Sequence, residues 1–157
     1  MNKICLAVFG CCLLFGALVF ADKRPNVVWI ISDDLGPELG CYGYPDVATP
    51  NLDRLAASGT RYTKAFSTAP VCSASRTACQ TGLYQTTVGG HHHNTRDKPV
   101  LPESMPTVTE LMQRAGYFVC NGRGYPDTKI AKSHFNFVYD SREFFDGIDW
   151  SERAEGQ

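Results

Sequence analysis

A long apolar segment without charge opens the chain. Met1–Lys3 carry one positive charge, Ile4–Ala21 carry none, and Asp22–Arg24 follow at once. A basic start, an apolar centre and a small residue before a polar stretch predict a signal peptide over residues 1–21, cleaved after Ala21. An uncleaved membrane anchor is the alternative, because the segment reaches the lower length limit for a span; the positive flank after it argues against this reading. Both readings predict that the rest of the chain is exported, to the periplasm or outside the cell.

Apolar runs and periodic helices alternate after this segment. The continuous β-branched run Val27–Ile31 predicts a strand buried on both faces, as in a parallel sheet. Thr49 and Pro50 predict a helix start, with Leu52, Leu55 and Ala56 as its apolar stripe and Gly59 as its end. Further along, the pattern predicts a short strand over 61–66, a helix just after Cys72, a helix over 107–115 and a strand over 117–120. This order predicts an α/β fold with a mostly parallel central sheet flanked by helices.

Composition excludes several classes of protein. The chain has 157 residues, of which 43% are hydrophobic and 20% charged, so it has the composition of a folded protein rather than a disordered or multi-span membrane protein. The net charge is −1, with no basic stripe, which argues against a nucleic-acid partner. Four cysteines follow the signal segment, Cys41, Cys72, Cys79 and Cys120, and in an oxidising compartment they are enough for two disulfides. No CxxC pair supports a zinc ribbon.

Asp33 and Asp34 follow the first predicted strand directly. Ligands of open α/β sheets bind at the carboxyl ends of the strands. Two carboxylates at that edge suit a hard divalent cation, calcium or magnesium. The alternative is a helix cap or a solvated turn, the commoner role of an Asp pair.

Cys72 and Arg76 form a second candidate site. If a helix begins at Ser73, Cys72 lies at its N-terminal end, where backbone N–H groups favour an anion. Arg76, four residues on, shares the helix face and offers several donors to a tetrahedral oxyanion. A buried structural cysteine with a surface arginine is the alternative. Cys79, two turns after Cys72, is expected to pack in the core.

Three consecutive histidines, His91 to His93, stand in a polar loop over 89–102. Adjacent side chains do not easily converge on one ion, so a metal site is disfavoured. We interpret the loop as lining the mouth of a substrate pocket.

Several of these segments together resemble the sulfatase family. Cys72-Ser-Ala-Ser-Arg76, followed by Thr81-Gly82, is similar to the sulfatase signature Cys-x-Pro-Ser-Arg with its later Thr-Gly. Asp33-Asp34 and the Thr49–Ala56 segment resemble sulfatases in the same order, and the likeness runs from about Pro25 onward. Bacterial arylsulfatases and heparan N-sulfatase-like members look most similar. The resemblance implies the N-terminal part of the alkaline-phosphatase-like sulfatase fold over residues 22–157.

The resemblance also implies a chemistry. In the family the signature cysteine, here Cys72, is oxidised to formylglycine by a formylglycine-generating or sulfatase-maturating enzyme, and the hydrated aldehyde attacks sulfur. A divalent metal, calcium with magnesium as the alternative, is implied to bind Asp33, Asp34 and residue 72, and Arg76 to stabilise charge. Ala74 stands where the signature has proline, so modification is expected to depend on the host.

Lys132-Ser133-His134 resembles the family's Gly-Lys-x-His motif, with Ala131 at the glycine position. The resemblance implies that Lys132 and His134 bind sulfate oxygens and the aldehyde hydroxyl, and alternate residues of an extended segment do face one way. Lys129 is a competing candidate for the lysine, and a surface Lys with a loop His is the structural alternative.

Three functions follow from these observations. The first is a sulfatase acting on a sulfated small molecule or glycan, as an ester or a sulfamate. The second is a phosphonate or phosphodiester hydrolase of the same superfamily. The third is a truncated fragment that is inactive alone, because the family's second pair of metal ligands is expected further along than this chain extends.

Overall fold

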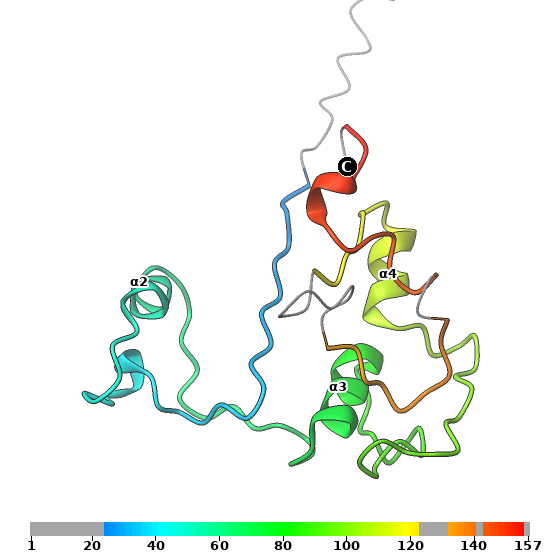
Figure 1. Cartoon of the computed structure of the whole chain (residues 1–157), viewed down its shortest axis with the longest axis horizontal. Coiled ribbons are helices and arrows are strands. Elements are labelled where there is room, and N and C mark those ends of the chain that lie inside the picture. Colours follow the sequence, from blue (N-terminus) through cyan, green and yellow to red (C-terminus); the bar gives the residue numbers. More distant parts are fainter. Residues whose placement is uncertain (1–23, 123–131, 141–142, 156–157) are drawn as a thin grey trace, which may run out of the picture. The chain divides into compact units, whose positions relative to one another are not determined.

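The computed structural model describes residues 24–122, 132–140 and 143–155 (Figure 1). The chain divides into two units, residues 1–32 and residues 33–157. The described helices all belong to the second unit: the 3₁₀ turn η1 (Gly40–Tyr42), the α-helices α2 (Pro50–Ser58), α3 (Cys72–Thr81) and α4 (Val108–Arg114), and the 3₁₀ turn η2 (Trp150–Glu152). No helix of the described residues is long and apolar enough to cross a membrane. The predicted signal peptide lies outside the described residues.

The predicted strands are not formed in the described part of the chain. Its only β-pairing is an isolated parallel bridge between Cys120 and Gly147. The segments 27–31 and 61–66 are irregular, and Val28 and Ile30 are 81% and 76% exposed. The prediction of a central parallel sheet is therefore wrong for these residues, and only the helices of the predicted α/β pattern are confirmed. The reason is physical: a strand takes its hydrogen bonds from a neighbouring strand, and Val27–Ile31 has no β-pairing among the described residues.

Helix α2 begins and ends as predicted, but its first residues are used differently. Thr49 occupies the N-cap position with Pro50 after it, yet the Thr49 side chain does not cap the helix. Its hydroxyl donates to Asp53 Oδ1 at 2.9 Å and accepts from the N–H of Gly40 at 2.8 Å, which fastens η1 to α2. The predicted apolar stripe stays open: Leu52 and Leu55 are 40% and 63% exposed.

Helix α4 has the most complete start signal. The Thr107 side chain accepts from the N–H of Glu110, and the Glu110 carboxylate accepts from the N–H of Thr107, which is a capping box. Gly116, with a φ of 80°, follows the helix and turns the chain away. The predicted helix over 107–115 is thus confirmed. A bond from Thr109 Oγ1 to Gln80 Oε1, 3.1 Å long, joins α4 to α3.

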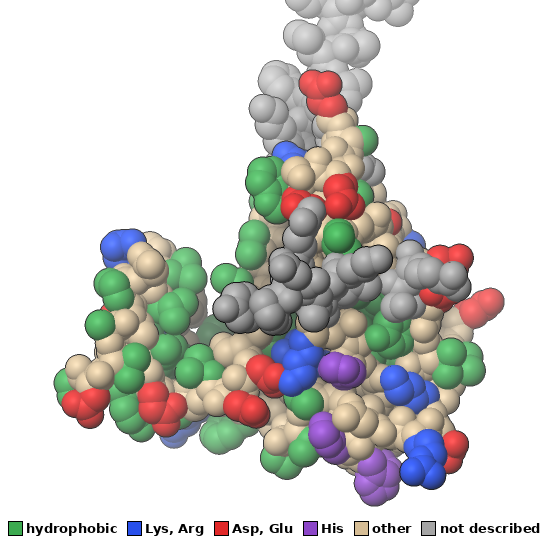
Figure 2. Space-filling model, viewed as in Figure 1, with side chains coloured by type: hydrophobic (Ala, Val, Ile, Leu, Met, Phe, Trp, Pro, Cys, Tyr) green, Lys and Arg blue, Asp and Glu red, His purple; other side chains and the backbone are tan. Residues whose placement is uncertain are grey.

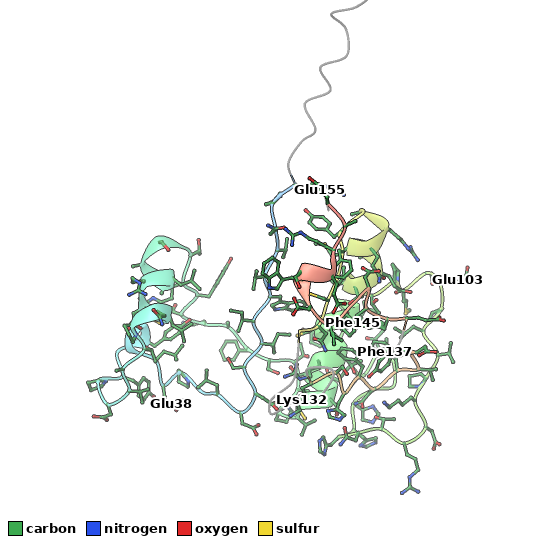
Figure 3. All side chains as sticks on the ribbon, turned by 45° about the horizontal axis from the view of Figure 1, so that its top comes forward. Glu38, Glu103, Lys132, Phe137, Phe145 and Glu155 are labelled. Atoms are coloured by element: carbon green, nitrogen blue, oxygen red, sulfur yellow. The ribbon has the colours of Figure 1, made fainter. Side chains whose placement is uncertain are left out.

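The core of the second unit is small and centred on α3. Ala74 and Ala78 of this helix are buried, as are Phe135 and Phe137. The two phenylalanine rings stack with centroids 5.4 Å apart, and further aromatic rings, those of Tyr139 and Phe144, contact both. Figure 3 labels Phe137 within this region. The segment 132–140 is joined to α3 by hydrogen bonds from the N–H of Asn136 to Thr77 and from Arg76 to the carbonyl oxygen of Lys132, and these contacts carry the candidate site.

The four cysteines after the signal segment are free thiols, so neither of the two possible disulfides is present. Cys79 is only partly buried rather than fully packed in the core. Burial nevertheless raises the pKa of the Cys79 thiol above its ordinary value, with the charge of Arg76 opposing the shift.

Candidate active site

Cys72 is the first residue of the ten-residue helix α3, one position earlier than predicted. Val71 before it is extended, with φ −123° and ψ 140°, and no side chain caps the helix. The first turn therefore leaves backbone N–H groups without intrahelical acceptors. This start places Cys72 at the positive end of the helix dipole, where an anion is favoured.

Arg76 lies one turn after Cys72 on α3, and its side chain reaches the segment 132–140. Its Nη1 donates to the carbonyl oxygen of Lys132 at 3.4 Å. Its Nε is buried and finds no acceptor among the described residues. A guanidinium held between helix and coil in this way brings a fixed positive charge beside the start of α3.

Lys132 and Asp33 form an ion pair between Nζ and Oδ2. The hydrogen bond from Lys132 is the main cause of a lowered pKa of Asp33, and the positive charges of Arg76 and His134 lower this pKa further. The same hydrogen bond raises the pKa of Lys132, and the nearby Cys72 side chain acts in the same direction. Figure 2 shows acidic, basic and histidine side chains gathered on one face, and Lys132 is labelled in Figure 3.

Of the six predicted site residues, Lys132 pairs with Asp33, Arg76 donates to the carbonyl oxygen of Lys132, Cys72 begins the helix that carries Arg76, and His134 follows Lys132 by two residues. The sixth, Asp34, follows Asp33 with a φ of 52°, a left-handed conformation uncommon for a residue with a side chain. The competing candidate Lys129 lies outside the described residues.

The predicted metal ligands Asp33, Asp34 and Cys72 stay a prediction. Asp33 and Asp34 offer the hard oxygen donors that calcium takes. However, no three His, Cys, Asp or Glu side chains of the described residues lie close enough together to hold a metal ion. In the structure the ammonium of Lys132 contacts Asp33 Oδ2. This is a carboxylate oxygen that Asp33 would need in order to bind a metal ion. The described residues do not by themselves form a complete metal centre.

His93 is a neighbour of Cys72 that the sequence pattern did not single out. Its Nε2 lies 3.6 Å from Cys72 Sγ, across a separation of 21 residues. The sequence predicted a polar loop here, with all three histidines at a pocket mouth. In the structure, the residues on either side of the histidines, Gly89 and Asn94, both adopt positive φ, 69° and 49°. These turns reverse the chain and return it to α3.

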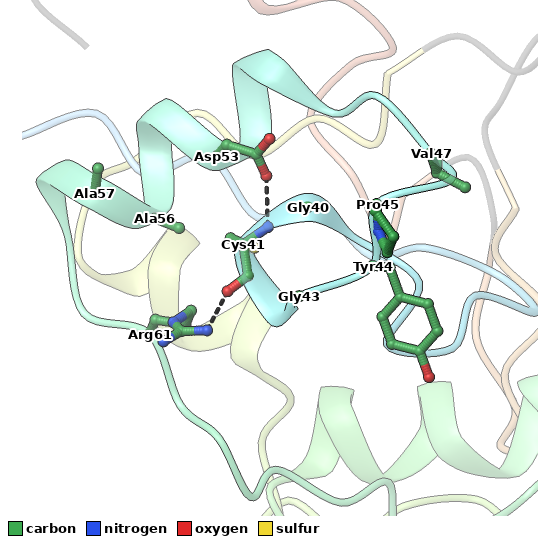
Figure 4. Close-up of a pocket in the computed structure, with 10 residues that line it drawn as sticks. All are labelled: Gly40, Cys41, Gly43, Tyr44, Pro45, Val47, Asp53, Ala56, Ala57 and Arg61. Atoms are coloured by element: carbon green, nitrogen blue, oxygen red, sulfur yellow. Dashed lines mark hydrogen bonds between the residues drawn. The ribbon is translucent and has the colours of Figure 1, made fainter.

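A separate cavity lies between η1 and α2. It has a volume of about 790 Å³ and is open to solvent. Asp53 accepts from the N–H of Cys41 at 2.7 Å, and Arg61 donates to the carbonyl oxygen of Cys41, so these bonds define its walls (Figure 4). None of the six predicted site residues lines it. Its position therefore says nothing about the chemistry at Cys72.

Comparison with known proteins identifies relatives over most of the chain. The sulfatase family model matches residues 25–156. The ulvan-active sulfatase of Formosa agariphila is 32% identical over 109 residues, 63% of this chain and 18% of that protein. The steryl-sulfatase of Mus musculus is 38% identical over 122 residues, 73% of this chain and 18% of that protein.

Human arylsulfatase A is 41% identical over 108 residues, which cover 67% of this chain and 21% of that protein. The chain therefore spans about a fifth of the length of the curated relatives it matches. No solved structure gives a significant match.

Proposed function

The chain belongs to the sulfatase family, and from this premise we propose that the protein hydrolyses sulfate esters or sulfamates at Cys72. The observation that carries the proposal is the contact of Lys132 with Arg76, which lies one turn after Cys72 on α3. Arg76 and Lys132 are separated by 56 residues, yet the arginine donates to the lysine's carbonyl oxygen. Two cationic side chains beside the N-terminus of α3 suit a tetrahedral sulfate anion.

We propose that Cys72 acts after oxidation to formylglycine. That group supplies a hydrated aldehyde as nucleophile, chemistry that no unmodified side chain offers. Arg76 and Lys132 hold positive charge beside it and stabilise the negative charge that develops on the sulfate oxygens. His134 follows Lys132 by two residues, so it is proposed to bind the same anion.

A divalent metal is proposed as a second requirement, calcium first and magnesium as the alternative. Asp33 and Asp34 are the proposed oxygen ligands, because hard cations prefer carboxylates. Binding of an ion there would compete with the ammonium of Lys132, which contacts Asp33 in the structure. Released from Asp33, the Lys132 side chain would be available to the substrate anion.

The proposed substrate is a sulfated carbohydrate, because the polar histidine loop lies next to Cys72. Sulfated small molecules remain within the same proposal, and the protein is proposed to be exported after removal of residues 1–21. Modification of Cys72 requires a formylglycine-generating or sulfatase-maturating enzyme as partner. In the structure Ala74 at the altered signature position is fully buried in α3.

Mass spectrometry after co-expression with a maturating enzyme tests the proposal. Cleavage after Lys64 and Arg76 releases the peptide 65–76, which contains Cys72. We expect the aldehyde form of this peptide together with hydrolysis of aryl or glycan sulfates that Cys72→Ala abolishes. Unmodified cysteine throughout, or turnover unchanged in Cys72→Ala, would overturn it.

A phosphonate or phosphodiester hydrolase is the second candidate, since its anionic substrate suits the same two cations. Parallel assays with aryl sulfate and aryl phosphate diesters separate the two functions. A preference for the phosphate diester would transfer the assignment to the second class.

A further inference from the structure

We propose that His93 is a further active-site residue and that Asn136 is the positioning residue that holds it against the side chain at position 72. The inference rests on the proposed function for its catalytic meaning, but not for its geometry. It assigns a role to one of three consecutive histidines, and it connects the buried Asn136 to the chemistry at Cys72.

His93 contacts both Cys72 and Asn94 through the same ring nitrogen. His93 Nε2 lies 3.6 Å from Cys72 Sγ and 3.3 Å from Asn94 Nδ2. An amide NH₂ group only donates hydrogen bonds, so Nε2 acts as an acceptor toward it. The single lone pair of this nitrogen is then shared between the Asn94 amide and the S–H of Cys72, or an O–H group at position 72 after modification. His93 is therefore placed to orient the side chain at position 72.

Asn136 holds the loop on both sides of His93. Its side-chain Nδ2 donates to the carbonyl oxygen of Gly90 at 2.8 Å and to that of His92 at 2.7 Å. Its Oδ1 accepts from the N–H of Thr95 at 3.2 Å. The residue is fully buried, and a buried amide that loses its partners is destabilising. These bonds fix the course of the backbone from Gly90 to Thr95.

Helix α3 also forms hydrogen bonds with Asn94 and Asn136. Ser73 Oγ accepts from the N–H of Asn94 at 2.9 Å, and Thr77 Oγ1 accepts from the N–H of Asn136 at 2.7 Å. Ser73 and Thr77 are fully buried. Position 72 therefore touches His93 while position 73, next to it on the helix, holds Asn94.

This arrangement goes further than packing requires. An apolar side chain could fill the site of Asn136, but it could not tie Gly90, His92 and Thr95 to one point. Since the histidine between those ties is the one that reaches Cys72, the polar network sets the position of the His93 ring. His91 instead lies against His92, with ring centroids 4.1 Å apart.

Histidine-selective NMR on the full, unmodified chain tests the geometry without any catalysis. We expect Cys72→Ala to shift the side-chain nitrogen resonance of His93, assigned through His93→Gln, while that of His91 stays unchanged. Asn136→Asp keeps an acceptor and loses both donors, so the His93 response to Cys72→Ala should disappear in that background. A His93 resonance indifferent to Cys72→Ala overturns the proposal.

Two further variants separate positioning from loss of stability. Ser73→Ala releases the loop at Asn94 and should weaken the His93 response even if Asn136→Asp fails to fold. Gln85→Leu removes another largely buried amide, one that donates to the carbonyl oxygen of Thr68, and should leave the His93 response intact. An equal loss of the response in Gln85→Leu overturns the positioning role.

The catalytic meaning is tested on matured protein. We expect His93→Gln and Asn136→Asp to lower kcat about 10- to 100-fold with little change in KM, the effect of a misplaced reacting group. Unchanged kcat in both variants overturns the active-site role. If the matured protein has no sulfatase activity while the NMR response is present, the proposed function fails and the His93–Asn136 arrangement stands.

Discussion

The Nζ of Lys132 pairs with Oδ2 of Asp33 across 99 residues of sequence. Both side chains remain about one-third exposed, so water and salt screen their attraction. The pair therefore contributes little to folding, while it joins the loop after residue 32 to the segment that carries His134. The two charged groups are proposed to act in binding instead, Asp33 toward a metal ion and Lys132 toward the substrate anion.

Lys132→Met separates these two roles. Because an exposed ion pair contributes about 0–1 kcal/mol, we expect the free energy of unfolding to change by no more than this, measured by urea titration monitored by circular dichroism. Sulfate turnover of matured protein should fall steeply, because a positive charge next to the substrate anion is lost. Lys98→Met, a lysine outside the site, is the control. A large loss of stability with turnover retained would contradict this account.

The pair also has a pH dependence of known sign. The pKa of Asp33 is lowered in the folded chain, so its contribution to stability is present above the carboxyl pKa of the unfolded chain. The contribution is lost as the pH falls through the lower folded value. Subtracting the unfolding profile of Asp33→Asn from that of the parent chain should show a small difference confined to acidic pH.

Gly90→Ala tests the packing beneath the histidine loop. A Cβ at this position would lie 3.1 Å from Asn136 Cβ and 3.2 Å from Thr77 Cγ2. Overpacking of this kind costs about 1–3 kcal/mol, so we expect a matching loss of stability and a shifted His93 resonance. Gly89→Ala is the matched control: its Cβ meets nothing within 4 Å, and only its φ of 69° is unfavourable. A shifted His93 resonance in Gly89→Ala alone would contradict this prediction.

Thr107→Ala removes the capping box of α4. Thr107 is 1% exposed, and its hydroxyl accepts from the N–H of Glu110 at 3.2 Å. Loss of an N-cap hydroxyl costs about 0.5–2 kcal/mol, which urea unfolding would detect. Thr107→Ser keeps the hydroxyl and should recover most of the loss. Equal destabilisation by both substitutions would mean that the buried methyl group, not the cap, carries the effect.

The sequence predicts elements well where their determinants are local. The helix starts at Pro50 and Thr107 depend on residues within one turn, and both are found in the structure. The start of α3 differs from the prediction by a single residue. The strand at Val27–Ile31 depends on partners distant in sequence, and its apolar pattern indicates only the burial that such partners would provide. Val27–Ile31 is paired with no such partner among the described residues, so it does not form a strand.

The candidate site divides in the same way. Cys72 and Arg76 share a helix, so their spacing alone places them on one face. The meeting of Asp33 with Lys132 was suggested by resemblance, because no local rule brings residues 99 positions apart together. The contact of His93 with Cys72 was not predicted, since it is produced by a buried network around Asn136 that leaves no periodic signal in the sequence.

Cys79 should make stability depend on alkaline pH. Burial raises the pKa of its thiol above the ordinary value of 9.0, so the unfolded chain releases this proton first. The contribution to stability is fully present below about 9.0 and is lost as the pH rises through the raised folded value. We expect Cys79→Ala to flatten this alkaline part of the unfolding profile. Alkylation by iodoacetamide at pH 8 should also be faster at Cys79 in urea than in buffer, and equal rates would contradict the burial.

The exposed run Val27–Ile31 predicts self-association. An unpaired β-branched segment offers both backbone hydrogen bonds and apolar side chains to another chain. Val28 and Ile30, 81% and 76% exposed, are expected to tolerate lysine without loss of stability. Val28→Lys with Ile30→Lys should therefore lower association measured by sedimentation velocity while the urea midpoint stays unchanged. Leu55→Lys, on the exposed face of α2, adds a charge elsewhere. If it lowers association equally, net charge rather than strand pairing drives the assembly.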